Sequence, residues 1–243
     1  MPILYDDRFI KQPNLEEEYT VEQIQTLARC ATDINYFLQF VQIVTLDKGR
    51  QRFDPYQYQK DLINMFNNNR WNIALLSRQS GKSTTVGAWA LQYAIFNRDK
   101  FIGIVSNKEK AAKDILRRIK LMYTELPFWM KPGVIEWNKT AIEFDNGTRI
   151  EVSATSESAF RGRSINVLIM DEFAFVPPGQ AEEFWAANYP ALSASAESKL
   201  IIISTPNGMF NLFHQLYTAA EKKINAFSHY FADWTVVPGR DAK

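Results

Sequence analysis

The first quarter of the chain has the spacing of apolar residues that is typical of helices. Between residues 19 and 45, apolar side chains recur at steps of three and four, which predicts a helix with one buried stripe. Thr20 stands before this stripe as an N-cap residue, and Gln23 follows three positions later, as in a capping box. The pattern breaks at Asp47-Lys48-Gly49, and a second helix is predicted over 56–68.

From residue 72 onward, short apolar runs alternate with helical patterns. The predicted strands cover 72–77, 101–106, 140–145, 148–154, 166–171, 200–204 and 227–232, and the predicted helices cover 82–97, 108–125, 180–192 and 209–223. Asn146-Gly147 joins two segments of alternating polarity, which is a strong hairpin signal. Since apolar strands alternate with helices, we expect an α/β fold with a mainly parallel sheet covered on both faces.

Composition narrows the class of protein. The chain has 243 residues, of which 46% are hydrophobic and 23% are charged, so wholesale disorder is excluded. No apolar run approaches the ~20 residues of a membrane span, and no basic start followed by an apolar stretch suggests a secretory signal. A single cysteine, Cys30, excludes an internal disulfide framework and a multi-cysteine metal site, which favours a soluble protein of a reducing compartment.

Charge is unevenly distributed, although the net charge is only +1. Residues 1–28 carry two basic and six acidic side chains, whereas residues 98–120 carry eight basic and three acidic ones. The basic segment fits two interpretations equally well, a solvated helix face or a surface that meets a polyanion.

A phosphate-binding loop is the sharpest chemical signal. The sequence Ser77-Arg78-Gln79-Ser80-Gly81-Lys82-Ser83 follows a predicted strand and opens a predicted helix. Backbone N–H groups of such a loop cradle phosphate oxygens, Lys82 would reach the β- and γ-phosphates, and the Ser83 hydroxyl would bind Mg²⁺. The first glycine of the usual motif is replaced here by Leu76. The predicted nucleotide contacts of this loop are Ser77, Arg78, Gln79, Ser80, Gly81, Lys82, Ser83 and Thr84.

Two acids end another apolar strand, Val167–Met170. Carboxylates that stand only at the carboxyl end of a buried strand suit a site at that edge of the sheet. Asp171 would hold Mg²⁺ through the water shell of the ion. Glu172 would act as the general base that polarises the attacking water. With the phosphate loop upstream, these acids predict hydrolysis of a nucleoside triphosphate.

Further polar residues could complete the site. The amide of Gln59 could read adenine, and the hydroxyls of Ser204 and Thr205, at another strand end, could bond to the γ-phosphate or its water. A guanidinium from Arg161 or Arg78 could pair with phosphate oxygens, in its own subunit or in a neighbouring one. Each of these residues also has an ordinary interpretation as a surface or turn residue.

Taken together, these motifs resemble the N-terminal ATPase domain of the large terminase subunit of tailed bacteriophages. The segments that carry the resemblance are Tyr58 to Asp61, Ser77 to Ser83, Phe160-Arg161-Gly162, Leu168 to Pro177 and Ile201 to Gly208. The resemblance implies a P-loop NTPase fold of the RecA-like (ASCE) type, with a mainly parallel central sheet flanked by helices and a small helical N-terminal lid subdomain. It also implies ATP hydrolysis that powers the translocation of double-stranded DNA into a procapsid.

The resemblance assigns roles and partners as well. Gln59 resembles the adenine contact, Ser204 and Thr205 match the motif that couples hydrolysis to movement, and Arg161 matches a finger supplied to the adjacent subunit. ATP and Mg²⁺ are the implied cofactors. Implied partners are double-stranded DNA, the portal protein, the small terminase subunit and further copies in a ring, a pentamer in the family, with a monomer as the alternative for the isolated chain. No membrane contact is implied. The implied location is the host cytoplasm, transiently docked on the procapsid portal and outside the mature virion.

The same resemblance suggests a division of the chain. We expect a lid subdomain over 1–48, an ATPase core over 49–236 and, over 237–243, the start of a linker to a nuclease domain that this chain lacks. Two other classes of protein remain open. One is the ATPase lobe of a superfamily 2-type helicase or remodeller, and the other is a nucleotide-binding regulatory or scaffold protein. Strand displacement separates the helicase from a duplex translocase, and turnover separates an enzyme from a scaffold.

Overall fold

A mixed sheet lies at the centre of the computed structural model, which describes residues 9–45, 47–156, 158–160 and 162–238. In this part of the chain, eight strands follow the order β10-β3-β9-β8-β4-β7-β6-β5. Their bounds are β3 Trp71–Leu76, β4 Phe101–Ser106, β5 Val134–Trp137, β6 Ala141–Phe144, β7 Arg149–Ala154, β8 Val167–Asp171, β9 Lys199–Ser204 and β10 Ser228–Ala232. Neighbours are parallel from β10 to β7, and β7, β6 and β5 are antiparallel. The predicted mainly parallel sheet is confirmed.

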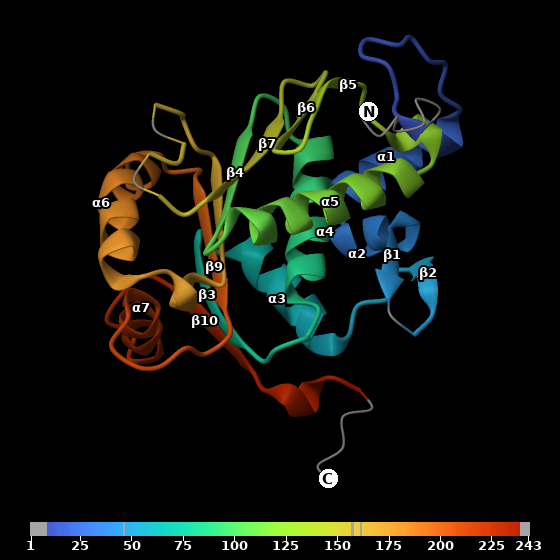
Figure 1. The fold of residues 1–243 in the computed structure, drawn as a ribbon. Helices are drawn as coiled ribbons and strands as arrows, with labels where there is room; N and C mark the ends of the chain where they lie inside the picture. The colour runs from blue at the N-terminus through green and yellow to red at the C-terminus, as the bar shows by residue number, and fades with distance from the viewer. Residues whose placement is uncertain (1–8, 46, 157, 161, 239–243) are drawn as a thin grey trace.

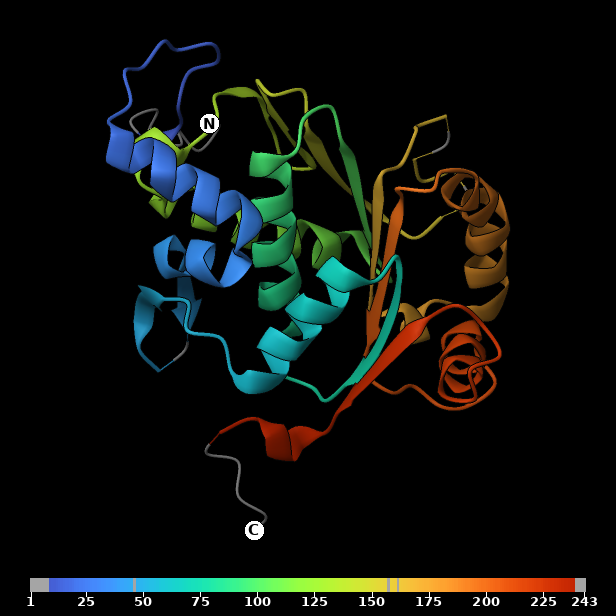
Figure 2. The ribbon, with the colours of Figure 1, turned by 180° about the vertical axis from the view of Figure 1, so that it is seen from behind.

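Helices cover both faces of the sheet, as the alternation of elements predicts (Figures 1 and 2). One face carries α1 Val21–Thr32, α2 Ile34–Phe37, α3 Gln57–Asn68, α4 Lys82–Phe96 and α5 Glu109–Glu125, and the other carries α6 Pro178–Ala194 and α7 Leu212–Glu221. Short 3-10 turns lie at Leu38–Phe40, Phe128–Met130, Phe173–Phe175 and Trp234–Val236. None of the described helices has both the length and the apolar character needed to cross a bilayer.

The single helix predicted over 19–45 is wrong in its second half. Its start is confirmed, because Thr20 and Gln23 form the expected capping box. The helix ends at Thr32, where Asp33 caps the short α2 by accepting a hydrogen bond from the Tyr36 N–H. A polar side chain that bonds to the backbone in this way ends one helix and starts the next.

A hairpin replaces the last part of that predicted helix. Strand β1 (Gln42–Thr45) pairs antiparallel with β2 (Gly49–Arg52). Ile43-Val44-Thr45 are all β-branched, and such side chains favour an extended backbone over a helix. The predicted boundary between residues 48 and 49 falls inside this hairpin. The division into lid, core and linker itself stays a prediction.

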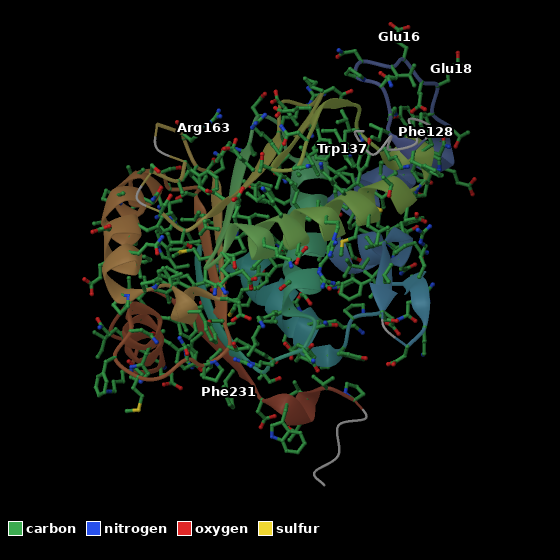
Figure 3. The ribbon with its side chains drawn as sticks, in the orientation of Figure 1. Glu16, Glu18, Phe128, Trp137, Arg163 and Phe231 are labelled. Atoms are coloured by element: carbon green, nitrogen blue, oxygen red, sulfur yellow. The ribbon has the colours of Figure 1, made fainter. Side chains whose placement is uncertain are left out.

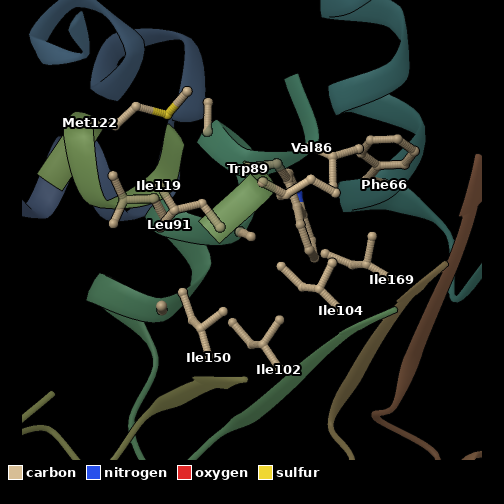
Figure 4. Packing of buried hydrophobic residues seen from close by; sticks show 14 of the residues in the cluster. Phe66, Val86, Trp89, Leu91, Ile102, Ile104, Ile119, Met122, Ile150 and Ile169 are labelled. Carbon is tan, nitrogen blue, oxygen red and sulfur yellow. The ribbon is translucent and has the colours of Figure 1, made fainter. Parts of the chain in front are cut away.

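The N-terminal helices share the core of the sheet rather than forming one of their own. Cys30, Ile34 and Phe37 are buried in the same cluster as side chains from α3, α4, α5 and the strands. Figure 4 shows part of this cluster, where α4 and α5 pack over the sheet. The two helices approach closely at Gly87, where an added Cβ would lie 3.3 Å from Cγ1 of Ile119. Burying one large apolar side chain contributes about 1.5–3 kcal/mol, so this layer is a main source of stability.

The antiparallel end of the sheet contains the predicted hairpin at Asn146-Gly147. Gly147 adopts a φ of 80°, a left-handed value that glycine takes without strain. The Asn146 side chain turns back and donates to the carbonyls of Ala94 and Ile95 at the end of α4. Strand β5, which pairs with β6, was not predicted.

Two aromatic residues lie at different parts of the sheet, one over the interior strand β4 and one on the edge strand β10. Phe160 lies over Gly103 of β4, so closely that a Cβ on this glycine would be 2.7 Å from Cε2 of the ring. Phe231 projects from the edge strand β10 and is exposed (Figure 3). Glycine at 103 therefore provides the space in which the Phe160 ring lies.

Candidate nucleotide-binding site

The candidate site lies at the carboxyl end of the parallel strands. Asp171 closes β8 and is paired with Ser106 of β4 on one side and Ile203 of β9 on the other. Ser204 closes β9 opposite Leu75 of β3. Parallel pairing places all these strand ends at one edge of the sheet, so the loops that follow β3, β8 and β9 meet there.

The phosphate loop has the backbone shape that its sequence predicts. Leu76 ends β3 and is buried, which shows that the position of the missing glycine belongs to the strand. Gln79 and Gly81 have φ values of 56° and 83°, and Gly81 is the N-cap of α4. A Cβ at Gly81 would lie 2.7 Å from Nε2 of Gln59, so glycine is required for the close approach as well as for the turn.

The start of the loop is anchored to the far end of the chain. The Ser77 N–H donates to the Ala232 carbonyl at 2.9 Å, and the Ser77 hydroxyl donates to the Asp233 carbonyl at 3.2 Å. Further along the loop, Ser80 is buried, and its Oγ has no hydrogen-bond partner among the described residues. The N-terminal turn of α4, which follows, presents backbone N–H groups that suit an anion.

Three predicted site residues are in direct contact. Lys82 Nζ lies 2.8 Å from Glu172 Oε1, and the other carboxylate oxygen accepts hydrogen bonds from the Thr205 N–H at 3.1 Å and the Thr205 hydroxyl at 2.9 Å. Burial would raise the pKa of Glu172, but the ion pair with Lys82 and the two bonds from Thr205 outweigh it and lower this pKa. Glu172 is therefore an ionised carboxylate held in a fixed orientation.

Glu172 itself has an unusual backbone. Its φ and ψ are 51° and 39°, in the left-handed region that a residue with a side chain rarely adopts. This conformation ends β8 sharply and begins the 3-10 turn Phe173–Phe175. Strained backbone of this kind is concentrated at functional sites, where the surrounding structure holds it in place.

The surroundings of Asp171 are compatible with its predicted role as a magnesium ligand. Its side chain is buried, and burial, followed by the neighbouring charge of Glu172, raises its pKa to about 7, while Lys82 and Arg118 act in the opposite direction. Its Oδ1 is buried without a hydrogen-bond partner among the described residues. A buried carboxylate oxygen with this unmet capacity fits a hydrated Mg²⁺, which neutralises the carboxylate and supplies donors through its water.

Residues after β9 connect to the turn after β8. The Ser204 hydroxyl accepts from the Ala174 N–H at 3.1 Å, and the Asn207 amide donates to the Ala174 carbonyl at 3.0 Å. Ser204 therefore supports the loop that carries Glu172, whereas its neighbour Thr205 contacts Glu172 directly. Asn207 was not singled out as a site residue from the sequence, since a turn residue after a strand gives no special signal.

A cavity of about 770 Å³ adjoins the phosphate loop. Its lining residues are Ile43, Val44, Thr45, Lys48, Gln51, Arg52, Phe53, Asp54, Tyr56, Gln59, Gln79, Ser80, Gly81, Lys82, Ser83, Thr84, Arg118 and Val237. Four of these side chains are cationic and one is acidic, which favours an anionic ligand. The hairpin β1–β2 forms one wall, so the segment mispredicted as helix turns out to line the site.

The predicted adenine contact lies in this lining but is largely buried. Gln59 Oε1 accepts from the Tyr56 N–H at 2.9 Å, and Gln59 Nε2 donates to the Ser80 carbonyl at 3.4 Å. The amide thus joins the start of α3 to the phosphate loop. Its role toward adenine stays a prediction.

Only one of the two predicted arginines lies in the part of the chain that the structure describes. Arg78 is exposed, with Cζ 5.9 Å from the ring centroid of Phe175, and Arg161 lies outside the described residues. Three other cations, Lys48, Arg52 and Arg118, line the cavity instead. Arg118 belongs to the basic segment noted in the sequence, but periodicity alone does not distinguish it from its neighbours.

Comparison with solved structures supports the same fold. The ATPase domain of the Thermus phage P74-26 large terminase aligns with a TM-score of 0.64 and 21% identity, over 77% of this chain and 85% of that one. The HK97 bacteriophage large terminase aligns with a TM-score of 0.66 and 20% identity, over 84% of this chain and 43% of that one. The large terminase of the thermophilic bacteriophage D6E, in complex with ATP-gamma-S, aligns with a TM-score of 0.57 and 13% identity, over 77% of this chain and 47% of that one.

These likenesses show a shared α/β architecture, and this chain spans less than half the length of the HK97 and D6E terminases. The family assignment comes from the sequence itself. Residues 73–238 match the profile described as the terminase large subunit, T4likevirus-type, N-terminal, which includes the phosphate loop and the loops after β8 and β9 but not Gln59 or the β1–β2 hairpin. The chain therefore belongs to the terminase large subunit family, as the resemblance of its motifs predicts.

Proposed function

We propose that this chain hydrolyses ATP with Mg²⁺ as the N-terminal motor domain of a phage large terminase, and that hydrolysis drives double-stranded DNA into a procapsid. The contact among Lys82, Glu172 and Thr205 carries this proposal. It joins the lysine of a phosphate loop, an ionised carboxylate and the loop after β9 in one site. An anionic nucleotide is consistent with it, because four of the five charged side chains that line the cavity are cationic and the D6E large terminase is known in complex with ATP-gamma-S.

The chain's own residues divide the chemistry between them. N–H groups of the loop and of α4 bind the phosphates, and Lys82 neutralises charge that develops on the γ-phosphate. Glu172 accepts a proton from the attacking water, and Thr205 orients Glu172 for this step. Ser83 and Asp171 would hold Mg²⁺, which stabilises negative charge on the phosphate oxygens.

The wider assembly is part of the proposal. By membership of this family, the chain would act with the portal protein, the small terminase subunit and further copies of itself in a ring. It would do so in the host cytoplasm, docked on the procapsid portal only during packaging and absent from the mature virion. Arg161 would complete the site of an adjacent subunit, which makes turnover depend on assembly.

The decisive experiment measures steady-state ATP hydrolysis by the chain and by two variants, with and without double-stranded DNA. Lys82→Ala is expected to abolish nucleotide binding, and Glu172→Gln is expected to retain binding without turnover. Lys139→Ala, an exposed lysine outside the site, serves as the matched control. Unchanged turnover in Glu172→Gln would refute the proposed base and favour a nucleotide-binding scaffold protein.

A helicase lobe is the alternative motor. A tailed duplex distinguishes the two, since a helicase separates the strands, whereas a packaging motor moves along the duplex and leaves it paired. Unwinding by the chain, alone or as part of its assembly, would overturn the packaging proposal. The assignment of the ATPase site would still hold in that case.

A further inference from the structure

Arg118 occupies a position that the proposed mechanism has not used. It lies on α5, outside the phosphate loop and outside the acidic end of β8, and it lines the 770 Å³ cavity together with Lys82 and Ser83. Its Nη1 donates to the Thr84 hydroxyl at 3.3 Å. Thr84 directly follows Ser83 in the first turn of α4, so the guanidinium stands beside the N-terminal turn that follows the phosphate loop.

The packing of α5 on α4 holds this arginine in place. Ile119, the next residue, is fully buried and faces Gly87, one turn after Thr84. Because Gly87 has no side chain, the two helices come close together at this level. The backbone that carries Arg118 is therefore fixed by the core, as Figure 4 shows for Ile119, and only the side chain is free to turn.

The hydrogen bonding of Arg118 leaves most of its donors available. A guanidinium carries five N–H donors in a planar fork that matches phosphate oxygens. Among the described residues, Arg118 forms no ion pair, and its hydrogen bond is to a neutral hydroxyl. Arg117 provides a contrast on the same helix, since its Nη2 forms an ion pair with Asp114 at 3.1 Å and it does not line the cavity.

We propose that Arg118 is a further nucleotide-binding residue, which moves from Thr84 to the α- or β-phosphate of the bound nucleotide. The assignment to these phosphates follows from position. Backbone N–H groups of a phosphate loop cradle the α- and β-phosphates, whereas the γ-phosphate belongs to the side of Lys82 that faces Glu172. Arg118 contacts the loop's helix and not Glu172. The inference rests on the proposed function, because it requires a nucleotide in this cavity.

One consequence concerns α5. A phosphate bound by Arg118 would link this helix to the nucleotide directly, in addition to the packing of Ile119 on α4. Release of the nucleotide would return the guanidinium to Thr84. Nucleotide occupancy would then alter the charge presented by the basic face of α5, which includes Lys110, Lys113 and Arg117.

The test measures the affinity of the chain for ADP and for a non-hydrolysable ATP analogue, in the presence of Mg²⁺. Arg118→Ala is expected to weaken both about tenfold, the loss of a hydrogen bond to a charged group. Arg118→Lys retains the charge without the fork and is expected to recover part of the affinity. Arg117→Ala is the matched control and should stay within about twofold of the original chain, because the Arg117 charge is exposed, paired with Asp114 and outside the cavity lining.

Other results would overturn the inference. A loss confined to the ATP analogue would place Arg118 at the γ-phosphate, and equal losses in Arg117→Ala and Arg118→Ala would reduce its role to the general charge of α5. Unchanged nucleotide affinity together with weaker DNA binding would make Arg118 a DNA contact. The proposed function fails separately, if the original chain binds neither nucleotide or if Lys82→Ala binds both normally.

Discussion

Lys82 Nζ and Glu172 Oε1 are 2.8 Å apart, so the lysine that should bind the γ-phosphate is paired with the carboxylate that should activate water. A triphosphate must therefore compete with Glu172 for Lys82. The same contact stabilises the ionised form of Glu172, which a general base requires. Nucleotide binding and activation of the base are thus linked through one ion pair.

Replacing Glu172 by glutamine should separate these two effects. The amide retains the shape but no longer attracts Lys82 as an anion, so we expect nucleotide affinity to be equal or higher. Turnover should fall by about 10²–10⁴, the usual contribution of a positioned general base. Equilibrium binding of a fluorescent nucleotide and phosphate release measure the two quantities. Weaker binding in this variant would contradict the competition between carboxylate and phosphate.

Thr205 should affect turnover through Glu172 rather than through binding. In Thr205→Val the backbone N–H is retained, but the hydroxyl that donates to Glu172 Oε2 at 2.9 Å is lost. Loss of one hydrogen bond to a charged group costs about 1.5–3 kcal/mol, so we expect kcat to fall about tenfold or more. Thr205→Ser retains the hydroxyl and is the matched control. Equal kcat in the valine and serine variants would show that the hydroxyl does not orient the base.

Asp171 makes the stability of the protein depend on pH in a defined direction. Burial raises its pKa in the folded state from 3.8 to about 7, so the folded chain holds this proton more tightly than the unfolded chain does. The favourable contribution is therefore fully present below about pH 4 and is lost as the pH rises to about 7. In Asp171→Asn the side chain does not ionise, so the variant does not lose this stability as the pH rises. We expect the free energy of unfolding of the variant, relative to the original chain, to rise between about pH 4 and pH 7 and then to stay level, without Mg²⁺.

Denaturant unfolding at several pH values measures this difference, and nucleotide turnover provides the second readout. The variant should be inactive, because the metal-binding carboxylate is gone. A pH-independent difference between the two chains would mean that the pKa of Asp171 is not raised.

A substitution at Gly103 can test the predicted role of Arg161, because it would move the preceding residue, Phe160. A Cβ at this position would lie 2.7 Å from Cε2 of Phe160, the residue that directly precedes Arg161. Since the ring must shift to accommodate the added methyl group, Gly103→Ala should displace Phe160. If Arg161 acts on a neighbouring subunit, turnover per chain should rise with protein concentration in the original chain and rise less in the variant.

Nucleotide affinity should be the same in the original chain and in Gly103→Ala at every protein concentration. Gly179→Ala, at a glycine of α6 where an added Cβ meets nothing within 4 Å, is the matched control for adding a methyl group. An identical rise in the two chains would show that the position of Phe160 does not control Arg161.

Local sequence patterns predict the parts of this protein that local interactions determine. The phosphate loop and β8 each combine an apolar run with polar residues at one end, and parallel pairing brings Lys82, Asp171 and Glu172 together as expected. The helix over 19–45 fails because its apolar spacing fits a helix, whereas the cap at Asp33 and the pairing of β1 with β2 decide the outcome. Cross-strand partners are distant in sequence, so periodicity cannot reveal them.

The residues that line the cavity also could not be predicted from sequence periodicity. Gln59 reaches the site because α3 lies beside the phosphate loop, and Arg118 reaches it because Gly87 allows α5 to pack closely on α4. Neither contact follows from spacing along the chain. In both cases tertiary packing selects one polar side chain from several that the sequence leaves equivalent.

The two bonds from Ser77 to the chain after β10 have a mechanical consequence. Strand β10 runs parallel to β3, and the carbonyls of Ala232 and Asp233 hold the residue at which β3 becomes the phosphate loop. A pull on the chain beyond Asp233 would load the β10–β3 ladder in shear and reach Ser77 directly through its two hydrogen bonds. Force applied to the chain after β10 would therefore act directly on the phosphate loop, because the loop begins where β3 ends and β3 is paired with β10.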